Sequence, residues 1–263
     1  MSDKSTIEWT DSTWNPIRGC TKISPGCKHC YASTFAERFR GVPGHPFEQG
    51  FDLLLVPDKL DDPLHWKKPR RIFVNSMSDF FHEGVSDEYI IRVANVMMEA
   101  NWHTYQVLTK RSERMRDMVN SKLSFAAQAP HIWWGVSAED KKFGLPRIAH
   151  LQEAGVAVRF VSAEPLLEDL DSINLTGINW LIIGGESGHG ARPFHLDWAW
   201  NLIRECNRQK VACFMKQVGR QPWDSGQHLK LADAKGGDPT EWPVDLRVRE
   251  FPSAKPAEKL QAA

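Results

Sequence analysis

Three cysteines lie within eleven residues near the start of the chain, and their side chains can hold a metal. Cys20, Cys27 and Cys30 have the spacing C-x6-C-x2-C. A closed zinc site needs four ligands, so zinc would require His29 or a more distant residue as well. A thioredoxin-like redox pair would leave Cys20 unexplained. A 4Fe–4S cluster held by three thiolates keeps one iron open for another molecule. The spacing alone leaves zinc and the cluster as alternatives.

The elements that must position these cysteines follow a repeating pattern. After Pro69, short runs of β-branched and aromatic residues alternate with amphipathic segments, which is typical of a parallel sheet with crossover helices. We expect helices at Asp87–Ala100 (with Ser86 as N-cap), Arg111–Val119, Lys141–Ala154 and Asp197–Gln209. We expect strands at Ile72–Asn75, Thr104–Leu108, Ile132–Val136, Val158–Val161, Trp180–Ile183 and Ala212–Met215, and a seventh leading from Trp14 into Cys20.

This order of elements predicts an α/β fold: a partial (β/α) TIM-like barrel of about six to seven parallel strands. An open doubly wound sheet is the alternative. The barrel, with a cysteine loop at residues 19–31, is expected to span residues 1–220. An irregular C-terminal segment, 221–252, is expected to wrap the body through Trp223, Trp242 and Phe251. Residues 253–263 are expected to be disordered.

Polar residues follow each predicted strand, where parallel α/β folds place their sites. They are Asn75-Ser76-Met77-Ser78-Asp79, Thr109-Lys110-Arg111, Ser137-Ala138-Glu139, Ser162-Ala163-Glu164-Pro165, Gly184-Gly185-Glu186-Ser187 and Lys216-Gln217. The recurrence of such clusters at six strand ends favours a functional site at this edge of the sheet.

Composition narrows the class of protein. The 263 residues contain 33 basic and 33 acidic side chains, so the overall charge gives no argument about nucleic acid. The sequence shows no secretory signal and no apolar run long enough to span a bilayer. We therefore expect a cytoplasmic protein without a membrane partner, whose thiols stay reduced. Cys206 and Cys213 fall on apolar faces and are expected to be core thiols.

Cysteines in a loop before a helix and a parallel barrel resemble the radical S-adenosylmethionine (radical SAM) superfamily. The usual spacing there is C-x3-C-x2-C, and His29 stands where an aromatic residue usually lies. The segments Leu108-Thr109-Lys110, Gly135-Val136-Ser137 and Ser78-Asp79 are similar to the spore photoproduct lyase branch. Residues 7–16, 184–193 and 215–219 resemble a largely uncharacterised family of phage and prophage proteins placed in that superfamily.

The resemblance implies an enzyme with a 4Fe–4S cluster and S-adenosylmethionine as cofactors. A reductant of the flavodoxin or ferredoxin type would reduce the cluster. The cofactor would then yield a 5′-deoxyadenosyl radical that abstracts hydrogen from a substrate. The metal ligands would be Cys20, Cys27 and Cys30. The cofactor-binding residues would be His29 at the adenine, Ser76, Ser78 and Asp79 at the methionine ammonium, and Thr109, Lys110 and Ser137 at the carboxylate and ribose.

The substrate side is less specified. Glu164 and Glu186 are expected to place two carboxylates near a substrate, joined by Lys216, and these three are the catalytic candidates. A buried Glu–Lys pair that closes the barrel end is the structural alternative. The resemblance to the lyase branch implies nucleic acid or a nucleotide as a substrate class. The alternative function is a zinc-stabilised, non-catalytic binding protein of phage origin.

Overall fold

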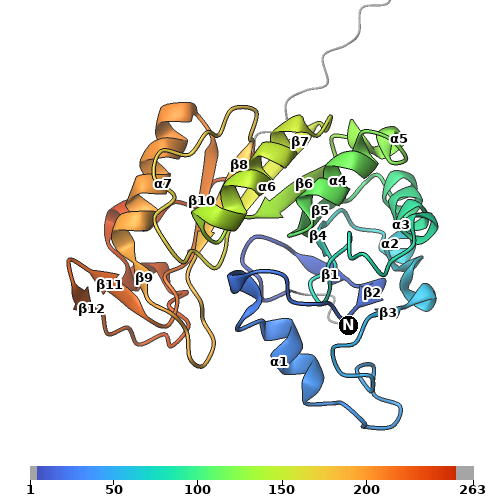
Figure 1. Ribbon diagram of the computed structural model, residues 1–263, viewed down its shortest axis with the longest axis horizontal. Helices are drawn as coiled ribbons and strands as arrows, with labels where there is room; N and C mark the ends of the chain where they lie inside the picture. The colour runs from blue at the N-terminus through green and yellow to red at the C-terminus, as the bar shows by residue number, and fades with distance from the viewer. Residues whose placement is uncertain (1–4, 253–263) are drawn as a thin grey trace, which may run out of the picture.

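The computed structural model describes residues 5–252, and one curved parallel sheet organises them (Figure 1). The sheet order is β1-β4-β5-β6-β7-β8-β10, and every pairing within it is parallel. The sheet curls into a half-barrel and stays open between β1 and β10. This confirms the predicted α/β fold with a partial barrel. The strands are β1 Ser12–Trp14, β4 Arg71–Val74, β5 Thr104–Thr109, β6 Ile132–Ser137, β7 Val158–Ala163, β8 Trp180–Gly184 and β10 Ala212–Gln217.

The helices that follow the strands cover the outer side of the curved sheet, whereas α1 lies apart from them near the open side of the arc (Figure 1). Two N-caps fix where outer helices begin: Ser86 Oγ accepts from Tyr89 N at 3.3 Å, and Asp140 Oδ1 accepts from Phe143 N at 2.7 Å. The helices are α1 Tyr31–Glu37, α2 Asp62–His65, α3 Asp87–Glu99, α4 Ser112–Val119, α5 Ser124–Ala127, α6 Lys141–Glu153 and α7 Leu196–Gln209.

The two faces of the sheet have different apolar cores, because side chains alternate along a strand. One set packs under the helices and includes Val74, Val107, Val136, Val161 and Ile183. Cys206 and Cys213 belong to this core, as expected, with exposures of 0% and 1%. The other core fills the concave face with Trp9, Phe73, Phe160, Trp180, Ile182 and Phe214. These large side chains close the inside of the half-barrel and leave its carboxyl edge to polar residues.

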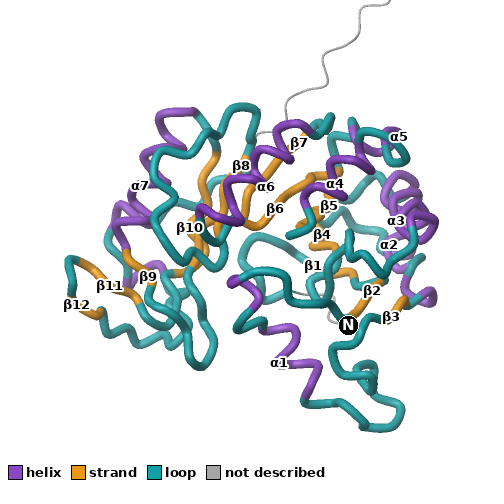
Figure 2. The backbone as a smooth tube through the Cα atoms, in the orientation of Figure 1, coloured by secondary structure: helices purple, strands orange, loops and turns teal. Residues whose placement is uncertain are grey.

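Two small sheets flank the half-barrel. β2 (Ile17–Arg18) pairs antiparallel with β3 (Leu54–Leu55), directly before the cysteine loop. β9 (Phe194–His195), β11 (Pro222–Asp224) and β12 (Gln227–His228) form a three-stranded sheet beside α7 (Figure 2). Short 3-10 turns occur at Pro25–Cys27, Pro57–Lys59, Pro239–Glu241 and Val244–Leu246.

The C-terminal segment returns to the body of the protein. Val248 O accepts from Met215 N at 2.8 Å, and Phe251 packs against Trp180 with ring centroids 5.3 Å apart. Trp242 is 2% exposed, whereas Trp223 packs beside β9 and β12. The expected disordered residues, 253–263, lie outside the described part of the chain. None of the helices between residues 5 and 252 is both long and apolar enough to cross a membrane.

Candidate functional site

The cysteine loop begins at a glycine that the fold requires. Gly19 has φ +79°, and a Cβ on it would lie 2.1 Å from Asp52 O. Its N–H donates to Met77 O at 3.0 Å, and it forms a parallel bridge with Ser78 just beyond β4. Cys20 N donates to Phe51 O at 3.2 Å. The backbone of the first cysteine is therefore fixed on two sides, by Phe51 before β3 and, through Gly19, by Met77 and Ser78 after β4.

The other two cysteines lie on a tight turn and a helix start. Cys27 ends the 3-10 turn that begins at Pro25, and Cys30 is the N-cap residue of α1. All three cysteines of the loop are free and half-buried. Ser24 Oγ lies 3.8 Å from Cys27 Sγ, within hydrogen-bonding range for sulfur. The loop thus presents three free thiols, and two of them, Cys20 and Cys30, pack against the edge of a small apolar cluster formed by Ala32, Ala36 and Phe51.

Arg111 joins the cysteine loop to the polar residues after β5. Its Nη1 donates to Cys20 Sγ at 3.5 Å and lies 3.2 Å from Asp79 Oδ2. Its Nε donates to Glu83 Oε2 at 2.6 Å, and its Nη2 donates to Thr21 Oγ1 at 2.8 Å. Only 9% of the Arg111 side chain is exposed. Strand-end reasoning placed Arg111 in a polar cluster but did not identify it as a site residue.

Asp79 is buried, and its two oxygens already accept three hydrogen bonds and form an ion pair. Oδ1 accepts from Thr109 Oγ1 at 2.6 Å and from Phe81 N at 3.0 Å. Oδ2 accepts from Lys110 N at 3.0 Å and faces Arg111 Nη1. A carboxylate with this many donors has little capacity left for a ligand ammonium. The structure places Asp79 beneath the site, where it fixes Thr109, Lys110 and Arg111.

The surroundings of Cys20, and above all its burial, oppose ionisation of the thiol. Burial, together with the nearby Asp79 carboxylate, raises the pKa of Cys20 to about 11, although Arg111 acts in the opposite direction. Conversely, the hydrogen bond from Arg111 lowers the pKa of Glu83 to about 2. A metal must displace the Cys20 proton to bind its sulfur, so metal binding there would release a proton.

A buried ion pair supports the middle of the cysteine loop. Glu139 is 0% exposed and pairs with Arg147 at 2.6 Å. A Cβ on Gly26 would lie 2.9 Å from Glu139 Cδ, so the loop passes directly over this carboxyl group. Burial alone would raise the pKa of Glu139, but Lys110 and Arg147 outweigh it and the net shift is downward. Neither Glu139 nor Arg147 was among the predicted site residues.

The predicted cofactor-binding residues fall into two groups. Lys110 Nζ donates to Ser137 Oγ at 3.1 Å, so these two side chains meet at the ends of β5 and β6. Ser78 Oγ donates to Ile17 O at 2.9 Å, and Ser76 Oγ lies 3.3 Å from Asn15 Oδ1. Both serine hydroxyls are thus turned toward the segment between β1 and β2. Tyr31, at the start of α1, also reaches this strand end and donates to Ser76 O at 2.6 Å.

The catalytic candidates form separate pairs. Lys216 Nζ lies 3.0 Å from Glu164 Oε1, and Ser162 Oγ donates to Glu164 Oε2 at 3.2 Å. A Cβ on Gly184 would lie 2.5 Å from Glu164 Oε1, so glycine makes room for this pair. The two side chains pair at the barrel end as in the structural alternative, but with exposures of 14% for Glu164 and 22% for Lys216 the pair is half-buried and not buried. The pair lies at the carboxyl edge of the sheet, where Glu164 follows β7 and Lys216 is near the end of β10.

Glu186 has a different cation as its partner. Arg192 binds both carboxyl oxygens of Glu186, through its guanidinium and through its backbone N–H at 2.9 Å. Burial raises the pKa of Glu186, but the Arg192 contacts lower it more, so the net shift is downward. Arg192 Nη1 also donates to Pro25 O at 3.0 Å, which ties the segment after β8 to the cysteine loop. His29 lies near this segment, 3.7 Å from where a Gly190 Cβ would be.

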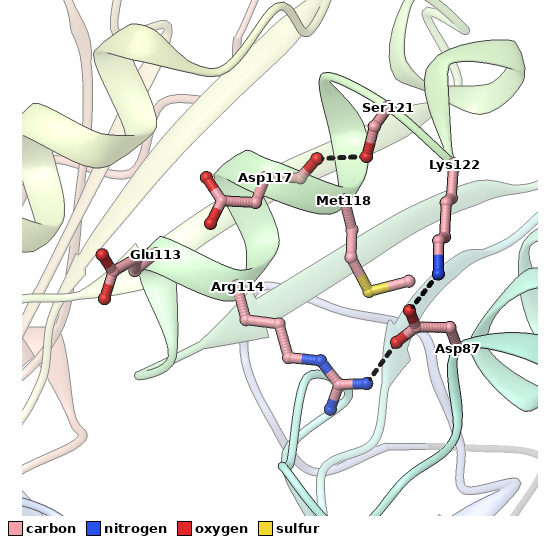
Figure 3. Close-up of a pocket in the computed structure, with 7 residues that line it drawn as sticks. All are labelled: Asp87, Glu113, Arg114, Asp117, Met118, Ser121 and Lys122. Atoms are coloured by element: carbon pink, nitrogen blue, oxygen red, sulfur yellow. Dashed lines mark hydrogen bonds and ion pairs between the residues drawn. The ribbon is translucent and has the colours of Figure 1, made fainter.

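Two open hollows occur on the outer surface near α4. The first, about 400 Å³, lies between α3 and α4, and Asp87 in it binds Arg114 and Lys122 (Figure 3). It contains none of the predicted site residues. The second, about 410 Å³, is lined by Ile23 of the cysteine loop and by Lys110, Arg111 and Arg147. The second hollow therefore borders the candidate site, whereas the first holds a surface ion-pair network.

Within residues 5–252, no group of three or more His, Cys, Asp or Glu side chains is gathered closely enough to hold a metal ion. A family model described as "Protein of unknown function (DUF5131)" matches residues 4–243. Neither the curated proteins nor the solved structures contain a match to the chain.

Proposed function

The chain belongs to the DUF5131 family, and we propose that it is a radical SAM enzyme in which Cys20, Cys27 and Cys30 hold an open 4Fe–4S cluster. The observation that carries the proposal is the position of the three free thiols. They lie on one loop that is tied to the carboxyl ends of a parallel half-barrel at three points, beyond β4, β5 and β8. Parallel α/β folds place their chemistry at this edge.

The donors around the loop fit a cluster held by thiolates. Arg111 donates to the sulfur of Cys20, and Ser24 lies within hydrogen-bonding range of the sulfur of Cys27. Such contacts stabilise the negative charge that thiolate-bound clusters carry. One metal ion with tetrahedral ligands would need sulfurs about 3.8 Å apart, since each Zn–S bond is ~2.3 Å. A cluster instead takes one thiolate at each of three irons, which allows a wider loop.

Polar groups beside the loop provide a place for S-adenosylmethionine. Lys110 supplies a cation for the methionine carboxylate, and Ser137 supplies a hydroxyl for the ribose. Thr109 and Asp79 keep the Lys110 backbone in place, so their roles are to position it. The backbone at Ser76 and Ser78 would face the methionine ammonium of the bound cofactor, and His29 would lie against its adenine.

When bound, the cluster and S-adenosylmethionine supply the electron and the radical chemistry, with a flavodoxin or ferredoxin type protein as electron donor. The chain's own side chains bind and orient the substrate. Glu164 and Lys216 present a carboxylate and an ammonium at the ends of β7 and β10. Glu186 and Arg192 present a second pair from the segment after β8. A nucleotide or nucleic acid remains the proposed substrate class, and these paired groups would hold its polar atoms.

Anaerobic iron–sulfur reconstitution of matched cysteine variants tests the proposal. The wild-type protein and Cys206→Ala should take up about four irons per chain and form 5′-deoxyadenosine when given dithionite and S-adenosylmethionine. Cys27→Ala should lose both properties, because it removes one of the three cluster ligands. Cys206→Ala is the control, since Cys206 is equally a free thiol but lies in the apolar core.

The same preparations distinguish the competing function. A colourless wild-type protein that retains stoichiometric zinc and makes no 5′-deoxyadenosine would replace the enzyme with a zinc-stabilised binding protein. Equal iron content in Cys27→Ala and wild type would show that the loop does not hold the metal at all.

A further inference from the structure

Arg111, the N-cap residue of α4, makes contacts that a purely structural arginine at this position would not need. We propose that Arg111 is a positioning residue for the cluster: it fastens the Cys20 sulfur and makes reduction of the bound cluster easier. This inference rests on the proposed function and adds to it a residue that controls the electron-accepting step.

The guanidinium is held in one orientation by three partners, and the buried one, Asp79, is itself fixed by other contacts. Asp79 accepts from Thr109 Oγ1 and from two backbone N–H groups, so its carboxylate cannot turn away from Arg111. Glu83 and Thr21 fix the Nε and Nη2 edges at 2.6 and 2.8 Å. Nη1 is thereby directed at both Asp79 and Cys20 Sγ. The contact to sulfur is a built feature of the site.

The cysteine that Arg111 holds is the one that the tight turn does not control. Two residues separate Cys27, at the end of the 3-10 turn, from Cys30, at the start of α1, whereas six residues separate Cys20 from Cys27. Gly19 fixes the Cys20 backbone through Met77 and Ser78. Arg111 adds the side-chain contact that fixes the position of the sulfur. Together they compensate for the long first gap.

A buried cation beside a ligating thiolate favours the state with more negative charge. Reduction adds one electron to the cluster, so the guanidinium stabilises the reduced state more than the oxidised state. Replacing Arg111 would also leave Asp79, whose side chain is 8% exposed, as an unopposed negative charge near Cys20. Both changes act in the same direction and make reduction harder.

The experiment is a redox titration of the anaerobically reconstituted cluster, without S-adenosylmethionine, in wild type, Arg111→Gln, Arg111→Lys and Arg192→Gln. We expect Arg111→Gln to lower the equilibrium constant for one-electron reduction of the cluster at least tenfold. This corresponds to a shift of the reduction potential by about 59 mV to more negative values. Arg111→Lys should shift less in the same direction, because it keeps the charge but loses the planar set of donors. Arg192→Gln is the control, since Arg192 contacts the loop at a backbone carbonyl and not at a sulfur.

A folded Arg111→Gln protein with the wild-type potential overturns the inference while the proposed cluster stands. If circular dichroism shows that Arg111→Gln is unfolded, the Arg111→Lys variant tests the inference instead. A wild-type reduction potential in Arg111→Lys would then overturn the inference. A shift of the same size in Arg192→Gln would also overturn it, because any loosening of the loop would then suffice. A wild-type protein that assembles no cluster removes the proposed function, and this inference with it.

Discussion

Two arginines hold the cysteine loop from strand ends that are separated in the sheet by β6 and β7. Arg111 follows β5 and is 9% exposed, and it reaches the sulfur of Cys20. Arg192 follows β8 and is 24% exposed, and it reaches only the carbonyl of Pro25. The Arg111 end of the loop is therefore built around a side chain that can do chemistry. The Arg192 end sets where the backbone lies.

The carboxylates on the two sides differ in the same way. Asp79 is held by two backbone N–H groups, a hydroxyl and Arg111 at once, so its position is over-determined. Glu164 is held by Lys216 and the Ser162 hydroxyl, and the donors to Glu186 come from one residue, Arg192. A ligand can exchange with one ion pair far more easily than with four converging donors. We therefore expect the residues around Asp79 and Arg111, beside the proposed cluster, to be rigid. We expect Glu164 and Glu186, beside the proposed substrate, to rearrange more easily.

The largest expected effect comes from removing the buried charge on the Arg111 side. Asp79→Asn should reduce the free energy of unfolding by about 3–5 kcal/mol, because it leaves Arg111 buried with an incomplete set of partners. Glu164→Gln should cost about 1 kcal/mol or less, since its Lys216 partner is 22% exposed. Urea denaturation of the metal-free proteins measures both. Equal losses of unfolding free energy in Asp79→Asn and Glu164→Gln would contradict the difference between these two regions.

A matched pair of glycines gives the next largest difference. Gly19→Ala places a methyl group 2.1 Å from a backbone oxygen at φ +79°, so the cysteine loop must shift. Gly190→Ala has a similar φ of +71° but meets nothing closer than 3.7 Å. We expect Gly19→Ala to lose most of its iron after reconstitution and Gly190→Ala to keep it, with a backbone strain cost of about 1 kcal/mol. Iron analysis per folded chain decides, and full iron loading in Gly19→Ala would refute the role of this turn.

Arg192→Gln should have a smaller effect that is confined to the loop. It removes the anchor at Pro25 O and the partner of Glu186, at a cost of about 1 kcal/mol for this partly exposed pair. We expect faster amide hydrogen exchange at residues 24–27, with exchange in α4 unchanged. If exchange increases equally in both segments, Arg192 supports the whole fold and not the loop.

The smallest effect concerns the pH dependence of the Arg111–Glu83 pair. The pKa of Glu83 falls from 4.5 to about 2 in the folded protein, so its stabilising contribution is complete above about pH 4.5 and disappears as the pH falls through about 2. Glu83→Gln should therefore be less stable than wild type above this window and equal to it below. The difference should stay under about 1 kcal/mol, because the Glu83 side chain is 65% exposed. Denaturation of metal-free protein across this pH range measures it, and a constant difference between the two proteins would exclude the ion pair as its source.

Hydrophobic periodicity was sufficient to predict six strands of the sheet and the outer helices. The seventh strand, expected to lead from Trp14 into Cys20, was misplaced: β1 ends at Trp14, and Ile17–Arg18 pairs with β3 in a separate sheet. The apolar runs that end at Asn75, Leu108 and Val136 correspond to β4, β5 and β6, because alternating burial leaves a clear pattern in sequence. The residues around the cysteines were harder. Asp79 looked available for a ligand because its sequence neighbours are polar, but its partners Thr109 and Arg111 come from another strand end. Hydrogen-bond partners that come from distant parts of the chain leave no pattern in the sequence around Asp79.

Arg111 illustrates what sequence patterns leave out. It stands at the junction of β5 and α4, where a basic residue usually faces solvent, and no spacing rule connects it to a cysteine 91 residues away. The same holds for Arg192, which is 167 residues from Pro25. General chemistry predicts that a thiolate site needs hydrogen-bond donors nearby. The fold was required to identify which donors these are.

The measurement that tests the central claim most directly is low-temperature electron paramagnetic resonance of the reconstituted, dithionite-reduced protein. The account predicts a signal from a reduced 4Fe–4S cluster whose g-values change when S-adenosylmethionine is added, because the open iron gains a ligand. A cluster signal that S-adenosylmethionine leaves unchanged, or no cluster signal in a protein with an intact Cys20, Cys27 and Cys30 loop, would contradict it.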